Sequence, residues 1–338
     1  MQRLHLRAGL FALVALVGSG LAACGGDDGP SVTIYSGRSE NQIAPILEEF
    51  AKATGIDVEV RYDQSADLAL RIVEEGDATR ADVYLSQSPG AVGFLDGEGL
   101  LDTVPDDILA LVPEGAHAAD GSWVGFSGRQ RVLVYNTDNV DPTELPASVL
   151  DMVGPEWNGR VGIAPSNGSF QDFVSAMRER LGDDATRAWL EGMAANDPVT
   201  YPSNNAIVAA IGRGEIDVGL VNHYYNYQRL AEDPGHPGAN HQFADDDIGS
   251  LVIVTAAAIV KGTDSPDEAA ELLRWLLAED AQRYFSDVTF EYPLANGIAP
   301  SADLPPLSFD RLDSAGFGAL GADLETTRTM IRDAGLEG

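Results

Sequence analysis

The sequence is short of cysteine, of basic side chains and of long apolar runs. Cys24 is the only cysteine among 338 residues, so the chain can form no internal disulfide and must take its stability from a packed core. It has 21 basic side chains against 53 acidic ones, a net charge of −32. Such a polyanion does not bind nucleic acid through a basic patch, and it attracts cations at long range.

The N-terminal apolar run, residues 8–17, is too short to span a bilayer as a mature helix. It follows a basic start and precedes Leu21-Ala22-Ala23-Cys24, which resembles the lipobox of bacterial lipoproteins. We therefore predict a signal peptide over residues 1–23, lipidation of Cys24, and a polar tether over residues 24–30. The mature chain would carry 19 basic and 53 acidic side chains, a net charge of −34, outside the cytoplasm and anchored to the cell membrane. The alternative is an ordinary secretory signal with an incidental cysteine.

Strands and helices alternate over residues 32–100. Alternating or continuous apolar residues predict strands, and apolar residues at helical spacing predict the helices between them. The predicted strands are 32–36, 56–62 and 81–85, and the predicted helices are 43–50, closed by Gly55, and 68–73. This order implies an α/β fold with a parallel sheet and right-handed crossovers.

A second α/β unit begins after about residue 130, and polar segments follow its strands at 166–169 and 222–227. The apolar stretch 250–260 predicts a strand that returns to the first unit, with Ser265 capping the next helix. Two similar units joined by strand crossings predict two lobes around a cleft, which is a favoured place for a ligand site. The predicted first lobe is 31–130 plus about 252–305, and the second is about 131–251 plus 306–338.

The run Asn222-His223-Tyr224-Tyr225-Asn226-Tyr227 contains three of the ten tyrosines. It lies where a predicted strand gives way to a helix, and ligands bind at such strand ends in open α/β sheets. Tyr224 and Tyr225 could share a metal in a first helical turn, where neighbours diverge by about 100°. A free tyrosine stays protonated up to about pH 10, so a trivalent metal best explains ionised phenols. The alternative is an aromatic cluster packed in the core.

Other polar residues allow more than one interpretation. Ser166-Asn167-Gly168-Ser169 precedes a predicted helix and is either an anion site or a simple N-cap. Arg38 and Arg129 are suited to bidentate binding of an anion, although ion pairs on the surface or between the lobes would also explain them. We expect His223 to form hydrogen bonds beside the site rather than to bind the metal.

Several motifs in order along the chain complete the pattern: Ile34-Tyr35-Ser36-Gly37-Arg38, Ser127-Gly128-Arg129, Trp157-Asn158-Gly159-Arg160, the tyrosine run, and Glu291-Tyr292-Pro293-Leu294. With these, the chain resembles the ferric-ion-binding periplasmic proteins of bacterial iron(III) ABC transporters over about residues 31–338. The resemblance implies a type II periplasmic binding protein fold, in which two lobes with mixed sheets are joined by hinge strands around a cleft. It also implies a monomer that captures Fe3+ with a synergistic carbonate or phosphate and delivers it to an ABC permease.

The resemblance assigns roles to individual residues. Tyr224 and Tyr225 match the family's two phenolate ligands; Ser166, Gly168, Ser169 and Asn204 match positions that hold phosphate; Arg38 and Arg129 match positions that hold carbonate in other members.

The chain also departs from the family. Ser39 and Gln87 occupy the positions at which some members have a histidine and a glutamate ligand. Other members use a further tyrosine near the position of Phe170, and phenylalanine cannot coordinate a metal. The remaining coordination positions would then come from the anion, water, Gln87 or Glu40, with Ser39 and His223 lying beside the ligands.

The leading hypothesis is therefore a receptor for ferric iron that is not an enzyme. A binding protein of the same fold for another ligand, such as an oxyanion or a small organic anion, is the alternative. An extracellular hydrolase is disfavoured, because the chain has five histidines, no G-x-S-x-G nucleophile elbow and no histidine-rich zinc motif.

Overall fold

The computed structural model describes residues 29–87, 89–307 and 323–336. The predicted signal peptide, Cys24 and most of the predicted tether lie outside these ranges, as does part of the last segment assigned to the second lobe. Within them, no helix combines the length and the apolar character that a membrane crossing requires.

The first sheet joins the N-terminal strands to strands from the middle and end of the chain. Its order is β2 (Asp57–Tyr62), β1 (Ser31–Ser36), β3 (Val83–Ser86), β10 (Val252–Val260) and β5 (Val124–Asn136), with the two-residue strands β4 (Leu101–Asp102) and β11 (Tyr292–Pro293) at its side. β1 pairs in parallel with β2 and β3, as the sequence predicts, whereas β10 is antiparallel to both of its neighbours.

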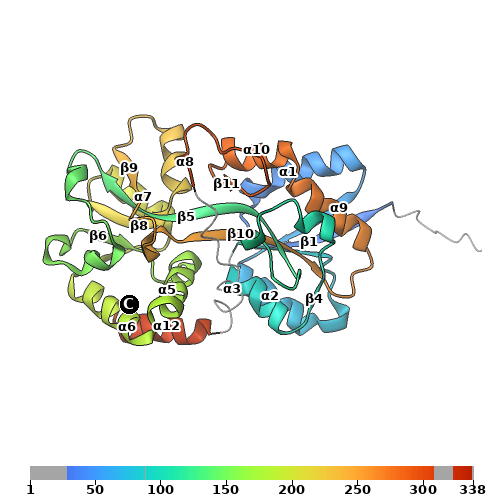
Figure 1. Ribbon diagram of the computed structural model, residues 1–338, viewed down its shortest axis with the longest axis horizontal. Coiled ribbons are helices and arrows are strands. Elements are labelled where there is room, and N and C mark those ends of the chain that lie inside the picture. The colour runs from blue at the N-terminus through green and yellow to red at the C-terminus, as the bar shows by residue number, and fades with distance from the viewer. Residues whose placement is uncertain (1–28, 88, 308–322, 337–338) are drawn as a thin grey trace, which may run out of the picture.

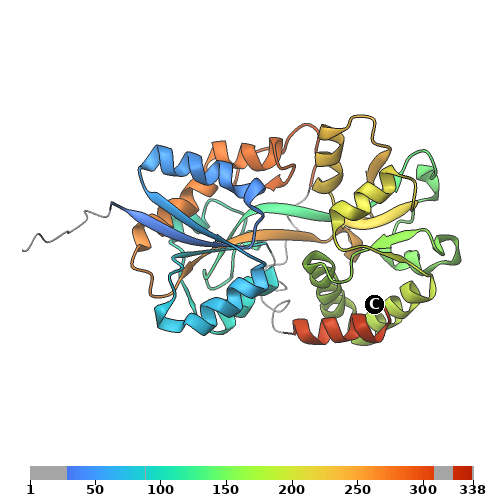
Figure 2. The same ribbon diagram turned by 180° about the vertical axis from the view of Figure 1, so that it is seen from behind.

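Helices cover both faces of this sheet (Figures 1 and 2). One face carries α1 (Glu40–Thr54), α9 (Pro266–Leu276) and α10 (Glu279–Asp287), and the other carries α2 (Ser65–Glu75) and α3 (Pro89–Gly97). The short helix α4 (Asp106–Leu109) follows β4.

α1 shows why these helices form. It buries Ile43, Ile46, Leu47 and Phe50, whose spacing places them on one helical face. The helix ends at Gly55, which has a left-handed φ of 75° that glycine adopts without strain. Phe50 packs edge-on against Trp275 of α9, with ring centroids 5.9 Å apart. The predicted helix and its stop signal are confirmed.

The second sheet is built from β5, β8 (Val218–Asn222), β6 (Val161–Ile163) and β7 (Val199–Thr200), with β9 (Gly238–His241) also paired to β5. Its helices are α5 (Gly168–Leu181), α6 (Asp183–Ala195), α7 (Asn204–Gly212), α8 (Tyr224–Glu232) and the C-terminal α12 (Leu324–Asp333). α12 packs against α5 (Figure 1), where the Ser175 and Thr327 hydroxyls are 2.8 Å apart.

β5 belongs to both sheets and joins the two halves of the molecule (Figure 2). Gln130 is paired with Val252 of the first sheet, and Arg131 is paired with Asn222 of the second. The strand therefore changes partners between two consecutive residues. This is the point at which the sequence analysis divided the chain into lobes.

The return strand predicted over residues 250–260 is β10, and α9 begins at Pro266 directly after Ser265, as predicted. Ser265 occupies the N-cap position, but its side chain accepts no hydrogen bond from the helix. Ser265 therefore precedes α9 at the predicted position but does not stabilise it through a side-chain capping hydrogen bond.

Candidate metal centre

The tyrosine pair begins a helix that follows a buried strand with no loop between them. β8 is buried at all five of its positions, and α8 starts at Tyr224. His223, the one residue between them, already has helical dihedral angles (φ −54°, ψ −40°). Tyr224 and Tyr225 therefore lie in a first helical turn, where neighbouring side chains can face one ligand.

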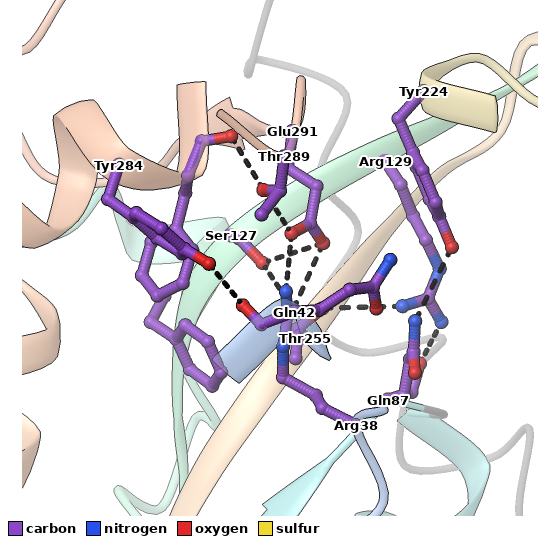
Figure 3. Close-up of polar contacts among 12 residues, drawn as sticks. Arg38, Gln42, Gln87, Ser127, Arg129, Tyr224, Thr255, Tyr284, Thr289 and Glu291 are labelled. Carbon is purple, nitrogen blue, oxygen red and sulfur yellow. Dashed lines mark hydrogen bonds and ion pairs between the residues drawn. The ribbon is translucent and has the colours of Figure 1, made fainter. Parts of the chain in front are cut away.

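Both tyrosine rings line a cavity of about 410 Å³. Their centroids are 4.2 Å apart, with ring planes at 31°. Tyr224 is fully buried and Tyr225 is half-buried. The Gln87 Nε2 group donates to the Tyr224 hydroxyl at 3.4 Å (Figure 3). This hydroxyl therefore points at a polar wall of the cavity and not into the apolar core.

The cavity gathers segments from the ends of strands in both sheets. The first half of the chain contributes the loop after β1, the start of α2 and Gln87 after β3, and the second half contributes the loop after β6 and the end of β8. Its lining residues include Ser39, Asp67, Gln87, Arg129, Ser166, Asn167, Gly168, Ser169, Asp172, Asn222, Tyr224, Tyr225 and Arg328. A ligand placed here would touch both halves.

The environment of Tyr224 holds its proton in place. Burial raises the pKa of Tyr224 well above 10, and the adjacent Tyr225 raises it further, while the positive charge of Arg129 acts in the opposite direction. At neutral pH the phenol stays neutral unless a strongly charged cation displaces its proton.

Two buried guanidinium groups lie beside the tyrosines. Arg129 donates through Nη1 to the Thr255 hydroxyl at 3.2 Å and through Nη2 to the Gln87 carbonyl (Figure 3). Arg131 donates through Nη1 to Asn222 Oδ1 at 3.1 Å, and its charge lies near Tyr225. In the described part of the chain, Arg129 Nε and Arg131 Nη2 have no hydrogen-bond partner. Buried donors of this kind favour an anion nearby.

The loop after β6 forms the opposite wall, where α5 begins. The helix cap is Asn167, whose Oδ1 accepts from the Ser169 backbone N–H at 3.1 Å and from its hydroxyl at 2.6 Å. Asn204 Nδ2 donates to Asn167 Oδ1 at 3.1 Å and to Ser169 Oγ at 3.2 Å. These contacts tie Ser169 and Asn204 together and present the N-terminus of a 14-residue helix to the cavity.

Not all of the predicted site residues reach this cavity. Gln87, Ser39, Arg129, Ser166, Gly168 and Ser169 line it together with the two tyrosines, and Asn204 contacts Ser169. Glu40 is an exposed residue at the start of α1 and does not line the cavity. Arg38 does not line it either, because its guanidinium forms a buried ion pair with Glu291. Cys24 lies outside the described residues.

His223 faces away from the tyrosine cavity. It lines a second cavity, of about 530 Å³, together with Tyr227 and Tyr292. Its Nδ1 accepts the Gln130 backbone N–H at 3.0 Å, and burial lowers its pKa to about 4. The expected hydrogen bonding of His223 is thus observed, and its place beside the metal ligands stays a prediction.

The sequence analysis did not choose Asp67, Asp172, Asn222 or Arg328, which line the cavity, or Arg131, which donates to the lining residues Ser169 and Asn222. Arg131 could have been predicted from its spacing to Arg129, because residues two apart in a strand point to the same face. Asn222 stood in the tyrosine run itself. Arg328 lies on α12, far along the chain, where it donates to Gln171 at 3.2 Å, and no local pattern could have placed it.

In the ranges that the structure describes, histidine, cysteine, aspartate and glutamate form no cluster of three suited to a metal. The cavity between the two sheets is instead the type of site that an extracellular solute-binding protein places between its lobes. Residues 78–315 match the family model of bacterial extracellular solute-binding proteins.

Individual relatives show which kind of solute-binding protein the chain is similar to. The chain is 30% identical to the Fe(3+)-binding periplasmic protein of Serratia marcescens over 97% of this chain and 96% of that one. It is 32% identical to the major ferric iron-binding protein of Neisseria meningitidis serogroup B, over 82% of this chain and 85% of that one. The crystal structure of iron-bound HitA from Pseudomonas aeruginosa superposes with a TM-score of 0.84 at 31% identity, covering 91% of this chain and 100% of that one.

The chain therefore belongs to the bacterial extracellular solute-binding protein family and, within it, to the ferric-ion-binding periplasmic proteins that the sequence resembles. The predicted type II periplasmic binding protein fold is confirmed.

Substitution of Glu291 by glutamine should destabilise the protein strongly. Burial alone would raise the pKa of Glu291, but the charge and hydrogen bonds of Arg38 hold it below its ordinary value of 4.5. Removing one partner of a buried pair costs about 3–5 kcal/mol. The ionised carboxylate contributes its stability above pH 4.5 and loses it as the pH falls through the lowered pKa. Urea unfolding should therefore show a lower free energy of unfolding for the variant than for the wild type, and this difference should become smaller below pH 4.5.

Glu279→Gln is the matched control, because Glu279 pairs with Arg283 on the surface at 3.1 Å. Exposed pairs of this kind contribute little. Equal losses of stability in the two variants would contradict the assignment of Glu291 to a buried, ionised pair.

Proposed function

We propose that the protein is a receptor for ferric iron that binds one Fe3+ through the phenolate oxygens of Tyr224 and Tyr225, together with an oxyanion, and passes the ion to an ABC permease. The observation that carries this proposal is the pair of adjacent phenols in one helical turn, facing a cavity between the two sheets. The names of the relatives from Serratia and Neisseria support iron as the ligand.

The chemistry of the donors favours a trivalent ion. Ferric ion is hard and prefers oxygen donors. Because burial keeps Tyr224 protonated, a bound cation must have enough charge to displace its proton. Divalent ions meet this demand less well, so the same burial that makes the phenol a poor acid makes the site selective.

An anion would complete the coordination sphere. We propose that a synergistic carbonate or phosphate lies at the N-terminus of α5, near Ser166, Gly168 and Ser169, with Asn204 holding Ser169 in place. Arg129 and Arg131 supply positive charge behind it. Gln87 and water are the candidates for further coordination positions. Arg38 and Glu40 are not part of this proposal, because neither lines the cavity.

Closure of two lobes would trap the ion. We propose that one lobe comprises residues 31–130 with about 252–305, and the other about 131–251 with 306–338. The boundary between the lobes then falls where β5 changes partners, between Gln130 and Arg131, and at the start of β10. Since the cavity takes residues from both halves, a ligand that bridges them favours the closed form. No catalytic residue enters this proposal.

A binding protein for an oxyanion alone is the second candidate. Ser39 and Gln87 replace the histidine and glutamate ligands of some members, and two buried guanidiniums beside a helix N-terminus would hold an anion without metal. The two candidates differ in colour, because only a ferric-phenolate site absorbs visible light.

Tyr224→Phe and Tyr225→Phe should each remove most of the ferric affinity and most of the visible absorbance, since each deletes one phenolate oxygen. Tyr227→Phe is the matched control, because Tyr227 lies in the same run but lines the other cavity. The measurement is titration with ferric citrate followed by visible absorbance, with excess citrate to reverse it. Full colour in the Tyr225→Phe variant, or a colourless wild type, would refute the proposed ligands.

We further propose that residues 1–23 are removed and that lipidated Cys24 anchors a monomeric receptor outside the cytoplasm. The acidic mature surface would then attract cations at the membrane. Cys24→Ser should move the protein from the membrane fraction to the soluble extracytoplasmic fraction after cell fractionation. Unchanged membrane association of this variant would contradict the anchor.

A further inference from the structure

A buried ion pair between Arg38 and Glu291 lies outside the lining of the tyrosine cavity and contacts both β5 and β10. Arg38 and Glu291 are 1% exposed, and the guanidinium meets the carboxylate through Nη1 at 3.0 Å and Nη2 at 2.5 Å (Figure 3). Arg38 Nη1 also contacts the hydroxyls of Ser127 on β5 and Thr255 on β10, at 3.2 and 3.3 Å. The pair is thus fixed to the two strands that join the halves of the molecule.

The hydroxyl of Thr255 connects this pair to the cavity. Its oxygen accepts a hydrogen bond from Arg38 and another, at 3.2 Å, from Arg129 Nη1. Arg129 in turn donates to the Gln87 carbonyl, and the Gln87 side chain donates to the Tyr224 hydroxyl. Figure 3 shows these contacts as one continuous series from Glu291 to Tyr224.

We propose that Arg38 and Glu291 are a positioning pair that holds Arg129 beside the Tyr224 oxygen through Thr255. The inference rests on the proposed function, because it concerns how the ferric site is kept in shape. It replaces the anion-binding role that the resemblance implied for Arg38 with a role inside the protein.

The charges explain why such a pair is needed. Arg38 and Arg129 share one acceptor, so two positive groups lie close together in the interior. Glu291 neutralises Arg38 through two hydrogen bonds and also accepts from Ser127 and Thr289 at 3.1 and 2.8 Å. With Arg38 neutralised, the charge of Arg129 remains available to a phenolate or an anion. A fixed guanidinium at this point stabilises negative charge on Tyr224 without binding the metal.

The position of Arg38 excludes direct contact with an anion in the cavity. Its two Nη groups are occupied by Glu291, Ser127 and Thr255, and the residue does not line the cavity wall, although its buried Nε has no partner among the described residues. Arg129 does line it. The two arginines that the sequence analysis grouped as anion ligands therefore have different roles: Arg38 positions Arg129, and Arg129 faces the cavity.

Thr255→Val tests the connection, since it removes the shared hydroxyl at nearly constant shape and leaves the charges in place. Loss of a buried hydrogen bond to a charged group predicts about tenfold weaker ferric affinity, measured by competition with citrate, and a shifted phenolate-to-iron absorption band. Thr255→Ser keeps a hydroxyl and should restore both properties. Thr186→Val is the matched control, because Thr186 is equally buried but its hydroxyl donates to the carbonyl of Gly182, the residue before α6.

An unchanged band and affinity in Thr255→Val, or equal losses in Thr186→Val, would overturn the inference while leaving the proposed function intact. A wild-type protein that gains no colour from ferric citrate would overturn both.

A second measurement separates positioning from anion binding. The double variant Arg38→Met, Glu291→Gln removes both members of the ion pair, so neither is left as an unpaired buried charge. The positioning role predicts a shifted absorption band, with inorganic phosphate increasing ferric affinity by the same factor as in wild type. Loss of the phosphate effect with an unchanged band would show that Arg38 is an anion ligand and would refute the proposal.

Discussion

The site depends on the abrupt change from strand to helix at His223. Successive side chains of a strand point to opposite faces, so two neighbouring tyrosines could share one ion only if the chain became helical at once. β8 ends at Asn222 and α8 begins at Tyr224, which leaves a single residue for the turn. The backbone thus fixes the relative position of the phenols, and the burial of β8 fixes the backbone.

Charge is organised differently on the surface and in the interior. The chain as a whole has a net charge of −32, yet Arg38, Arg129 and Arg131 are all buried in the interior. An acidic surface draws cations towards the protein, while buried guanidiniums favour anions in the interior. Glu291 neutralises Arg38 in a buried ion pair.

Local sequence patterns predicted most of the fold and the position of the tyrosine pair at the end of a strand. Apolar spacing and Gly55 defined α1, alternation defined β2, and the tyrosine run marked the end of β8 correctly. The contacts that local patterns could not supply join residues far apart in the chain. Arg38 meets Glu291 across 253 positions, and Arg328 reaches the cavity from α12. Partner choice of this kind depends on tertiary packing, which spacing does not encode.

Resonance Raman spectroscopy of the iron-loaded protein, excited in its visible band, tests the central claim most directly. If Tyr224 and Tyr225 bind Fe3+ as phenolates, tyrosinate ring vibrations should be enhanced and should shift when the protein is made with ring-deuterated tyrosine. A protein that binds ferric ion but shows no tyrosine-dependent vibrations would contradict the account, because the ion would then lie on other donors.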